Sequence, residues 1–148
     1  MHNRPMGAWG TDPFDNDDAA DFSASVRGTA GAEALADSCA TTCSAVLTED
    51  GVELGTATEA IAAAVVVGVA AGADDALVSS PYGPGAGACR LLAQLPAAQF
   101  GALRALAATA LDRIFDERDN EWYDEWQDSG ELDDIRSVLE PVRAALRR

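Results

Sequence analysis

The stretch that decides the fold of this chain is Thr58-Glu-Ala-Ile-Ala-Ala-Ala-Val-Val-Val-Gly-Val-Ala-Ala-Gly-Ala73. Ile61, Val65 and Val69 recur at helical spacing, and nearly every position between them is apolar as well. A helix that is apolar nearly all round is typical of the buried centre of a protein. The three consecutive valines would also suit a strand, but the alanines around them favour a helix. We therefore expect residues 58–73 to form a central, buried helix.

Two glycines within this stretch, Gly68 and Gly72, lie one helical turn apart. Because glycine has no side chain, this spacing allows a neighbouring helix to approach closely. The uncharged apolar run from Ala60 to Ala73 covers about fourteen residues, whereas a helix needs about twenty to cross a bilayer. The pattern therefore indicates close packing in a protein core and no membrane insertion.

Further helical stretches surround the central one and predict an all-α bundle. They span residues 17–26, 32–47, 91–95, 96–114, 121–127 and 132–146. Asn120 is a suitable cap for one of them, and Pro141 predicts a kink or a new helix start within the last. The composition of residues 79–87 predicts a loop. We expect five or six helices in a single domain over residues 6–148, after a short tail over 1–5.

The segment from Met6 to Phe22 joins an aromatic anchor to a helix start. The backbone can turn freely on both sides of Trp9, because Gly7 and Gly10 flank it. Asp15 or Asn16 is a good helix cap, and the acids after it suit the positive end of the helix dipole. We therefore predict that Trp9 and Phe14 are buried. The residues given a structural role are Gly7, Trp9, Gly10, Phe14, Asn16 and Asp17.

A cation site is the alternative interpretation of the same segment. Its candidate ligands are Asp12, Asp15, Asn16, Asp17 and Asp18. A calcium-binding loop needs Gly at its sixth position and Glu at its twelfth, where this chain has Asp17 and Ser23. The comparison favours the structural role, and we predict no metal site here.

The charge of the chain restricts its partners. The formal net charge is −15, and all ten basic residues are arginine. A chain with this much negative charge repels phosphate backbones and anionic lipids. We therefore expect neither nucleic-acid nor membrane binding. A basic protein partner is compatible with the charge. The chain shows no signal peptide and an odd number of cysteines, so we expect it in the cytoplasm. We also expect a monomer or a small homo-oligomer.

Residues suited to catalysis are scarce. The only histidine is His2, in the predicted tail, and lysine is absent. Cys39 and Cys43 share a helical face that Cys89 could approach, but three thiolates are one ligand short of a closed zinc site. We interpret the cysteines as small buried residues. No cofactor is predicted.

An acidic segment rich in aromatic residues is the best candidate for a binding surface. It comprises Glu121, Trp122, Tyr123, Asp124, Glu125 and Trp126. Aromatic anchors surrounded by charge are typical of protein interfaces. The sequence therefore favours a non-enzymatic, acidic interaction module, such as an immunity-type or inhibitory partner of a basic protein.

The alternative function is that of a magnesium-dependent helical hydrolase that uses the acidic cluster over residues 116–128. Glu117, Glu121, Asp124 and Asp128 fall near one face if the helix through them is continuous. Four carboxylates could hold Mg²⁺, which prefers oxygen ligands. A second pair of carboxylates upstream is missing, because no acidic residue lies between Asp75 and Asp112.

Three motifs in order also carry a family resemblance. They are Gly7-Ala-Trp-Gly10 with Phe14, Asn16, Asp17 and Asp21; Ala62-Ala-Ala-Val-Val66; and the run from Leu103 to Arg113 followed by Asn120, Glu121 and Trp126. From Met6 to about Leu146 the chain resembles domain-of-unknown-function family 4259, an uncharacterised bacterial family. The chain departs from the family's pattern at Asp12, where Gly is usual. The resemblance implies no activity and no catalytic residues.

Overall fold

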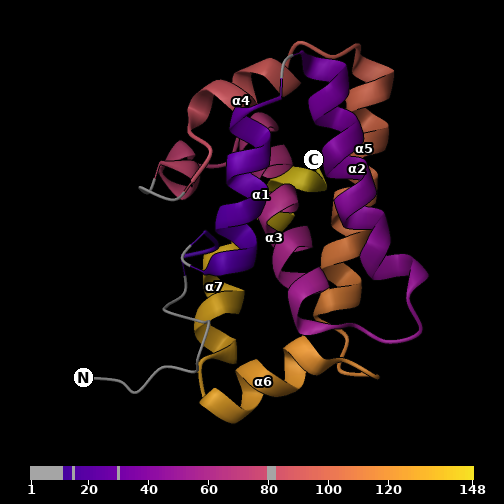
Figure 1. Cartoon of the computed structure of the whole chain (residues 1–148), viewed down its shortest axis with the longest axis vertical. Helices are drawn as coiled ribbons and strands as arrows, with labels where there is room; N and C mark the ends of the chain where they lie inside the picture. Colours follow the sequence, from indigo (N-terminus) through magenta and orange to yellow (C-terminus); the bar gives the residue numbers. More distant parts are fainter. Residues whose placement is uncertain (1–11, 15, 30, 80–82) are drawn as a thin grey trace.

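The computed structural model describes residues 12–14, 16–29, 31–79 and 83–148 (Figure 1). Its elements are α1 (Asp17–Arg27), α2 (Ala32–Thr48), α3 (Leu54–Ala70), the short 3-10 helix η1 (Asp75–Val78), α4 (Ala86–Leu92), α5 (Ala97–Ile114), α6 (Glu121–Ser129) and α7 (Leu132–Leu146). The all-α class is confirmed. The part of the chain that the structure describes has seven α-helices, slightly more than the five or six expected.

The higher number of helices arises because the two short predicted segments, over 91–95 and 121–127, correspond to separate helices, α4 and α6. The segment predicted over 91–95 overlaps α4 (Ala86–Leu92) only at its last two residues, because α4 starts at Ala86, inside the stretch that its composition marks as a loop. Gly85 makes this start feasible, because its φ of 82° is accessible to glycine and its N–H donates to the carbonyl oxygen of Val78 at 2.8 Å. In α6 the predicted cap Asn120 is confirmed, and Gly130 ends the helix with a φ of 77°.

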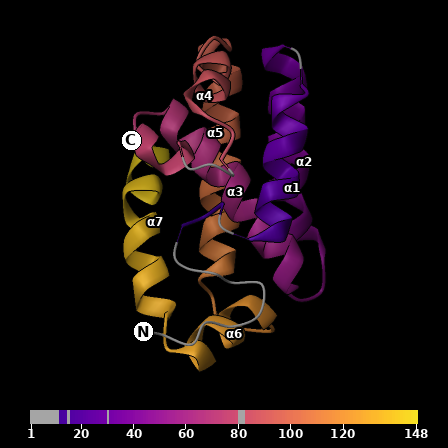
Figure 2. The same ribbon diagram turned by 60° about the vertical axis from the view of Figure 1, so that its left-hand side comes forward.

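α3 lies at the centre of the bundle, as expected. The other α-helices surround it in both ribbon views (Figures 1 and 2), and all of them pack against it. Every residue from Ala60 to Val69 is buried. The helix starts one turn earlier than expected, because the Glu121 carboxylate accepts a hydrogen bond from the Leu54 N–H at 2.9 Å. No helix within the described residues is long and apolar enough to cross a membrane.

The close helix approach expected at Gly68 is present. A Cβ atom built on Gly68 would lie 2.7 Å from Cγ1 of Val142 on α7, closer than carbon atoms in proteins approach. Gly72 has a different role, since its φ of 119° turns the chain after the end of α3. The crossing of α3 and α7 therefore depends on the missing side chain at Gly68.

We expect Gly68→Ala to lower the free energy of unfolding by about 1–3 kcal/mol, because the added methyl group overpacks the contact with Val142. Alanine is the better helix former by about 1 kcal/mol, so a net loss would show that overpacking dominates. In a double-mutant cycle with Val142→Ala, measured by urea denaturation, the combined loss should be smaller than the sum of the two single losses. Strict additivity would contradict the close contact.

Pro141 does not start a new helix. α7 runs from Leu132 to Leu146 and contains Pro141. The sequence predicted either a kink or a new helix start at this proline, and the structure excludes the new start. Pro141 is exposed, whereas Leu139 and Val142 beside it are fully buried. We attribute the continuity of the helix to this burial, which compensates for the backbone hydrogen bond that proline removes.

The N-terminal motif is described in part. Phe14 is fully buried, as predicted, and Oδ1 of Asn16 caps α1 by accepting a hydrogen bond from the Ala19 N–H at 2.8 Å. Asp17 lies exposed in the first turn. Oδ1 of Asp12 accepts a hydrogen bond from the Phe14 N–H at 2.9 Å. The other predicted structural residues, Gly7, Trp9 and Gly10, lie outside the described residues.

Candidate acidic interaction site

The two tryptophans predicted to be interface anchors belong to the core. Trp122 is 1% exposed and Trp126 is 7% exposed. The ring of Trp122 meets Phe115 edge-on at 5.4 Å between centroids, and Trp126 follows at 5.9 Å. Their spacing places both on the face of α6 that packs against α3 and α7. Neither is available as a surface anchor, which corrects the sequence-based expectation.

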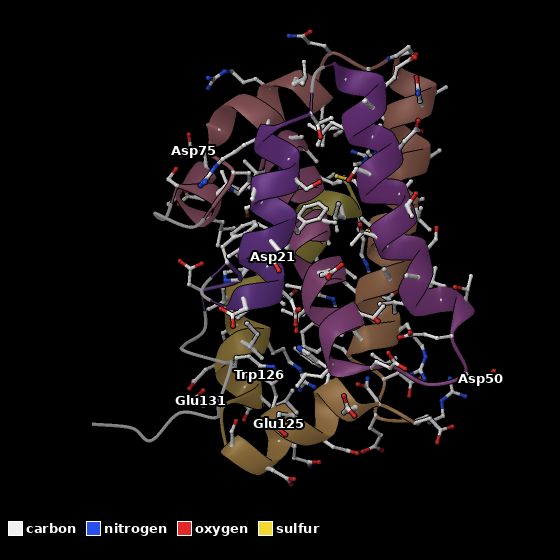
Figure 3. All side chains as sticks on the ribbon, in the orientation of Figure 1. Asp21, Asp50, Asp75, Glu125, Trp126 and Glu131 are labelled. Atoms are coloured by element: carbon white, nitrogen blue, oxygen red, sulfur yellow. The ribbon has the colours of Figure 1, made fainter. Side chains whose placement is uncertain are left out.

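The remaining predicted binding residues lie on or near the surface. Glu121 and Asp124 are exposed, and Tyr123 and Glu125 are half-buried. Figure 3 shows Glu125 and Trp126 together on α6. Tyr123 also packs against the core cluster. The surface of α6 is therefore acidic with little exposed aromatic area, and its binding role stays a prediction.

Asn120 joins the end of α5 to the start of α6. Its Nδ2 donates hydrogen bonds to the carbonyl oxygens of Ile114 at 2.7 Å and Asp116 at 2.8 Å. Its Oδ1 accepts from the Tyr123 N–H at 2.8 Å. The side chain is 3% exposed, so nearly all of its hydrogen-bonding capacity is used inside the protein.

The turn before α6 pairs with the loop between α2 and α3. The Val52 N–H donates to the carbonyl oxygen of Asp119 at 2.7 Å, and the Glu121 N–H donates to the carbonyl oxygen of Val52 at 2.8 Å. Two side chains add to this junction. The Glu121 carboxylate caps α3, and Oε1 of Glu49 accepts from the Glu53 N–H at 3.1 Å. The junction fixes two acidic segments that are far apart in the sequence.

An open pocket of about 430 Å³ lies at this junction. It is lined by Glu49, Asp50, Gly51, Val52, Glu53, Asp119 and Glu121. Five of these seven residues are acidic and none is basic. The two segments approach very closely here, since a Cβ atom on Gly51 would lie 3.0 Å from the carbonyl oxygen of Asp119. We refer to this feature as the acidic pocket.

Sequence reasoning identified only half of the acidic pocket. Asp119 and Glu121 belong to the predicted acidic cluster, whereas Glu49, Asp50 and Glu53 do not. The available signal was the charge pattern, because every charged residue from Glu33 to Asp75 is acidic. Figure 3 shows Asp50 at the outer edge of the α2–α3 loop.

The remaining acids of the predicted cluster do not converge on a metal site. Glu117 lies between α5 and α6, so it does not continue the helical face of Glu121, and the assumption of one continuous helix is wrong. Asp116 instead pairs with Arg118 at 2.7 Å, and this hydrogen-bonded arginine lowers the pKa of the Asp116 carboxyl. Among the described residues, no group of three or more potential ligands is arranged to hold a metal ion.

The three cysteines are buried and free. Burial raises the pKa of the Cys43 thiol to about 12 and that of Cys89 to about 11. Burial, and then the neighbouring Cys43 and Cys89, raise the pKa of Cys39 as well. All three are therefore protonated at neutral pH and poor nucleophiles, in agreement with their interpretation as small core residues.

These features define an acidic, all-α protein with a carboxylate-lined pocket at a loop junction. The family described as "Domain of unknown function (DUF4259)" matches residues 7–138, and this chain belongs to it. No curated protein and no solved structure matches the chain.

Proposed function

We propose that this protein is a non-enzymatic interaction module that binds a basic protein partner through the acidic pocket. The observation that carries the proposal is one open pocket whose lining includes five acidic residues and no arginine. Like charges held together repel one another, and a cationic partner would relieve that repulsion. An immunity-type or inhibitory role toward a basic protein is the corresponding biological class.

The geometry of the pocket suits the side chain of an arginine or lysine. Glu49 and Glu121 each accept a backbone hydrogen bond, so the protein itself holds their carboxylates in place. A carboxylate that is already positioned loses less conformational freedom when a guanidinium or ammonium group binds. The net charge of −15 adds long-range attraction, which accelerates encounter with a basic surface.

The alternative, a magnesium-dependent hydrolase, has no specific observation in its favour. Its four proposed ligands do not share one helix, as Glu117 precedes α6. We therefore carry only the interaction proposal forward.

Neutralising the acidic pocket should abolish partner binding. Asp50→Asn, Glu53→Gln and Asp119→Asn, combined in one variant, remove three charges and spare the two capping glutamates. Tagged full-length protein is used to capture partners from an extract of the source organism at low and high salt. We expect a partner that is retained at low salt and released at high salt, and that the variant recovers at about one-tenth of the wild-type amount or less.

A matched control separates the pocket from the overall charge. Glu33→Gln, Asp37→Asn and Glu140→Gln also remove three charges, from exposed positions on α2 and α7. This control variant should capture the partner within about twofold of wild type. Equal losses in both variants would show that only net charge matters, and the absence of any salt-sensitive partner would contradict the proposal.

A further inference from the structure

An open pocket of about 360 Å³ lies between the end of α3 and α4. Pockets of roughly 300–1,000 Å³ are typical of sites for small molecules. The described part of its lining comes from the last residues of α3, from the turn and η1 that follow, and from α4. Both η1 and α4 pack against α3, so the walls belong to the folded bundle. We refer to this feature as the α3–α4 pocket.

Small side chains leave the space in this pocket. Two of its alanines, Ala86 and Ala93, lie seven positions apart, so they share one face of α4 and its C-terminal cap. Ala70 and Ala73 line the same pocket from the end of α3. Because an alanine side chain ends at Cβ, the two walls do not fill the space between them. A larger side chain at one of these positions would occupy the pocket.

Two opposite charges line the α3–α4 pocket from different elements. Asp75 starts η1 and Arg90 belongs to α4, and both are exposed. They are the charged residues among the described lining. Figure 3 shows Asp75 beside the short helix η1. No ion pair joins Asp75 to Arg90, so only a molecule that spans the pocket can pair with both.

The thiol of Cys89 supports the proximity of these two charges. Cys89 lines the same pocket and is only 4% exposed. Burial raises the pKa of its thiol to about 11; Asp75 raises this pKa further, and Arg90 lowers it. The effect of a charge decreases with distance, so the carboxylate and the guanidinium both lie near this thiol.

The net charge of the chain restricts the ligand that these two side chains select. A chain of net charge −15 repels a small anion and attracts a small cation to many of its carboxylates. A zwitterion has no net charge, so neither effect acts on it. It gains most where an opposite pair of charges is available at a suitable spacing, as Asp75 and Arg90 are in the α3–α4 pocket.

We propose that the α3–α4 pocket binds a small aliphatic amino acid. Its carboxylate pairs with the Arg90 guanidinium, which offers two parallel N–H donors, and its ammonium group pairs with the Asp75 carboxylate. Its hydrocarbon part covers the alanines. So few atoms limit the affinity, and we expect a dissociation constant of about 1 mM. The site shares no residue with the acidic pocket and does not depend on the proposed partner.

An NMR titration of the nitrogen-15-labelled full chain tests the site. Glycine, L-alanine, β-alanine, γ-aminobutyrate and δ-aminovalerate serve as probes, and n-propylamine and propionate carry one charge each. For the best-fitting amino acid we expect saturable shifts of the Ala70, Ala73 and Arg90 amides. The two probes with a single charge should bind at least about tenfold more weakly, because each makes only one of the two charged contacts. The absence of saturable shifts for all five amino acids up to about 50 mM would overturn the proposal.

Three variants separate a pocket from a chance pairing with surface charges. Arg90→Gln and Asp75→Asn each remove one charge from an exposed position, and each should weaken binding by about tenfold. Ala93→Leu keeps both charges and fills the pocket, so it should abolish binding. The spectrum of each variant shows whether it is folded. Unchanged binding by Ala93→Leu would overturn the proposal, because the amino acid would then lie outside the pocket.

A distant double variant controls for the general charge of the surface. Arg118→Gln and Asp128→Asn also remove one charge of each sign, from exposed positions before and within α6. This control should bind the best-fitting amino acid within about twofold of wild type. A loss equal to that of Arg90→Gln would contradict the assignment of the carboxylate to Arg90.

Discussion

Trp122→Ala is expected to lower the free energy of unfolding by about 3–5 kcal/mol, as truncation of a large core aromatic does. Trp122 is the largest of the fully buried side chains among the described residues, and its ring contacts both Phe115 and Trp126. Its removal would leave a cavity between α6 and the rest of the bundle. Chemical denaturation with urea measures the loss directly.

The same substitution separates a core role from an interface role. Tyr123→Ala, on the neighbouring half-buried side chain, is the control and should cost only about 1 kcal/mol. An interface anchor behaves in the opposite way, because its truncation weakens binding and leaves the denaturation midpoint unchanged. A Trp122→Ala variant of wild-type stability would therefore show that the indole is not buried in the core.

Local sequence patterns were sufficient to predict the long helices of this fold, whereas α4 starts inside a stretch predicted as a loop. Residues 17–26 and 32–47 were expected as helices, and α1 (Asp17–Arg27) and α2 (Ala32–Thr48) agree within a residue. Their apolar stripes repeat at helical spacing over several turns, and such a signal needs no knowledge of the partner helix. The all-round apolarity of α3 indicated its central position for the same reason.

Contacts between distant segments could not be predicted from local sequence patterns. The first turn of α3 depends on a carboxylate from α6, through the hydrogen bond between Leu54 and Glu121. The acidic pocket depends on the pairing of Val52 with Asn120. The sequence around Val52 does not indicate that it pairs with Asn120, and the sequence around Asn120 does not indicate Val52. Only one of the two segments of the acidic pocket was therefore predictable.

The tryptophan pair shows a second limit of pattern reasoning. Two aromatic residues at i and i+4 predict one helical face, but they do not say whether the face meets solvent or another helix. The acids around Trp122 and Trp126 favoured the surface, whereas packing against α3 and α7 places both in the core.

Asn120→Asp is the second substitution with a large expected effect, and it changes little more than one amide nitrogen to oxygen. The carboxylate can still accept the hydrogen bond from the Tyr123 N–H, so the helix cap is retained. It cannot donate to the carbonyl oxygens of Ile114 and Asp116, which lie at 2.7 and 2.8 Å from Nδ2. The buried carbonyl oxygen of Ile114 thus loses its donor, the partly buried carbonyl oxygen of Asp116 keeps only its hydrogen bond from Arg113, and both face a negative charge instead.

We expect Asn120→Asp to lower the free energy of unfolding by about 2–4 kcal/mol at neutral pH, because one buried and one partly buried hydrogen bond are lost together. Asp119→Asn, one position earlier and exposed, is the matched control. It should cost less than about 0.5 kcal/mol, since Asn tolerates the φ of 44° found there. Urea denaturation of both variants decides the matter. Equal stability of Asn120→Asp and wild type would mean that the two donor bonds contribute nothing to the junction that shapes the acidic pocket.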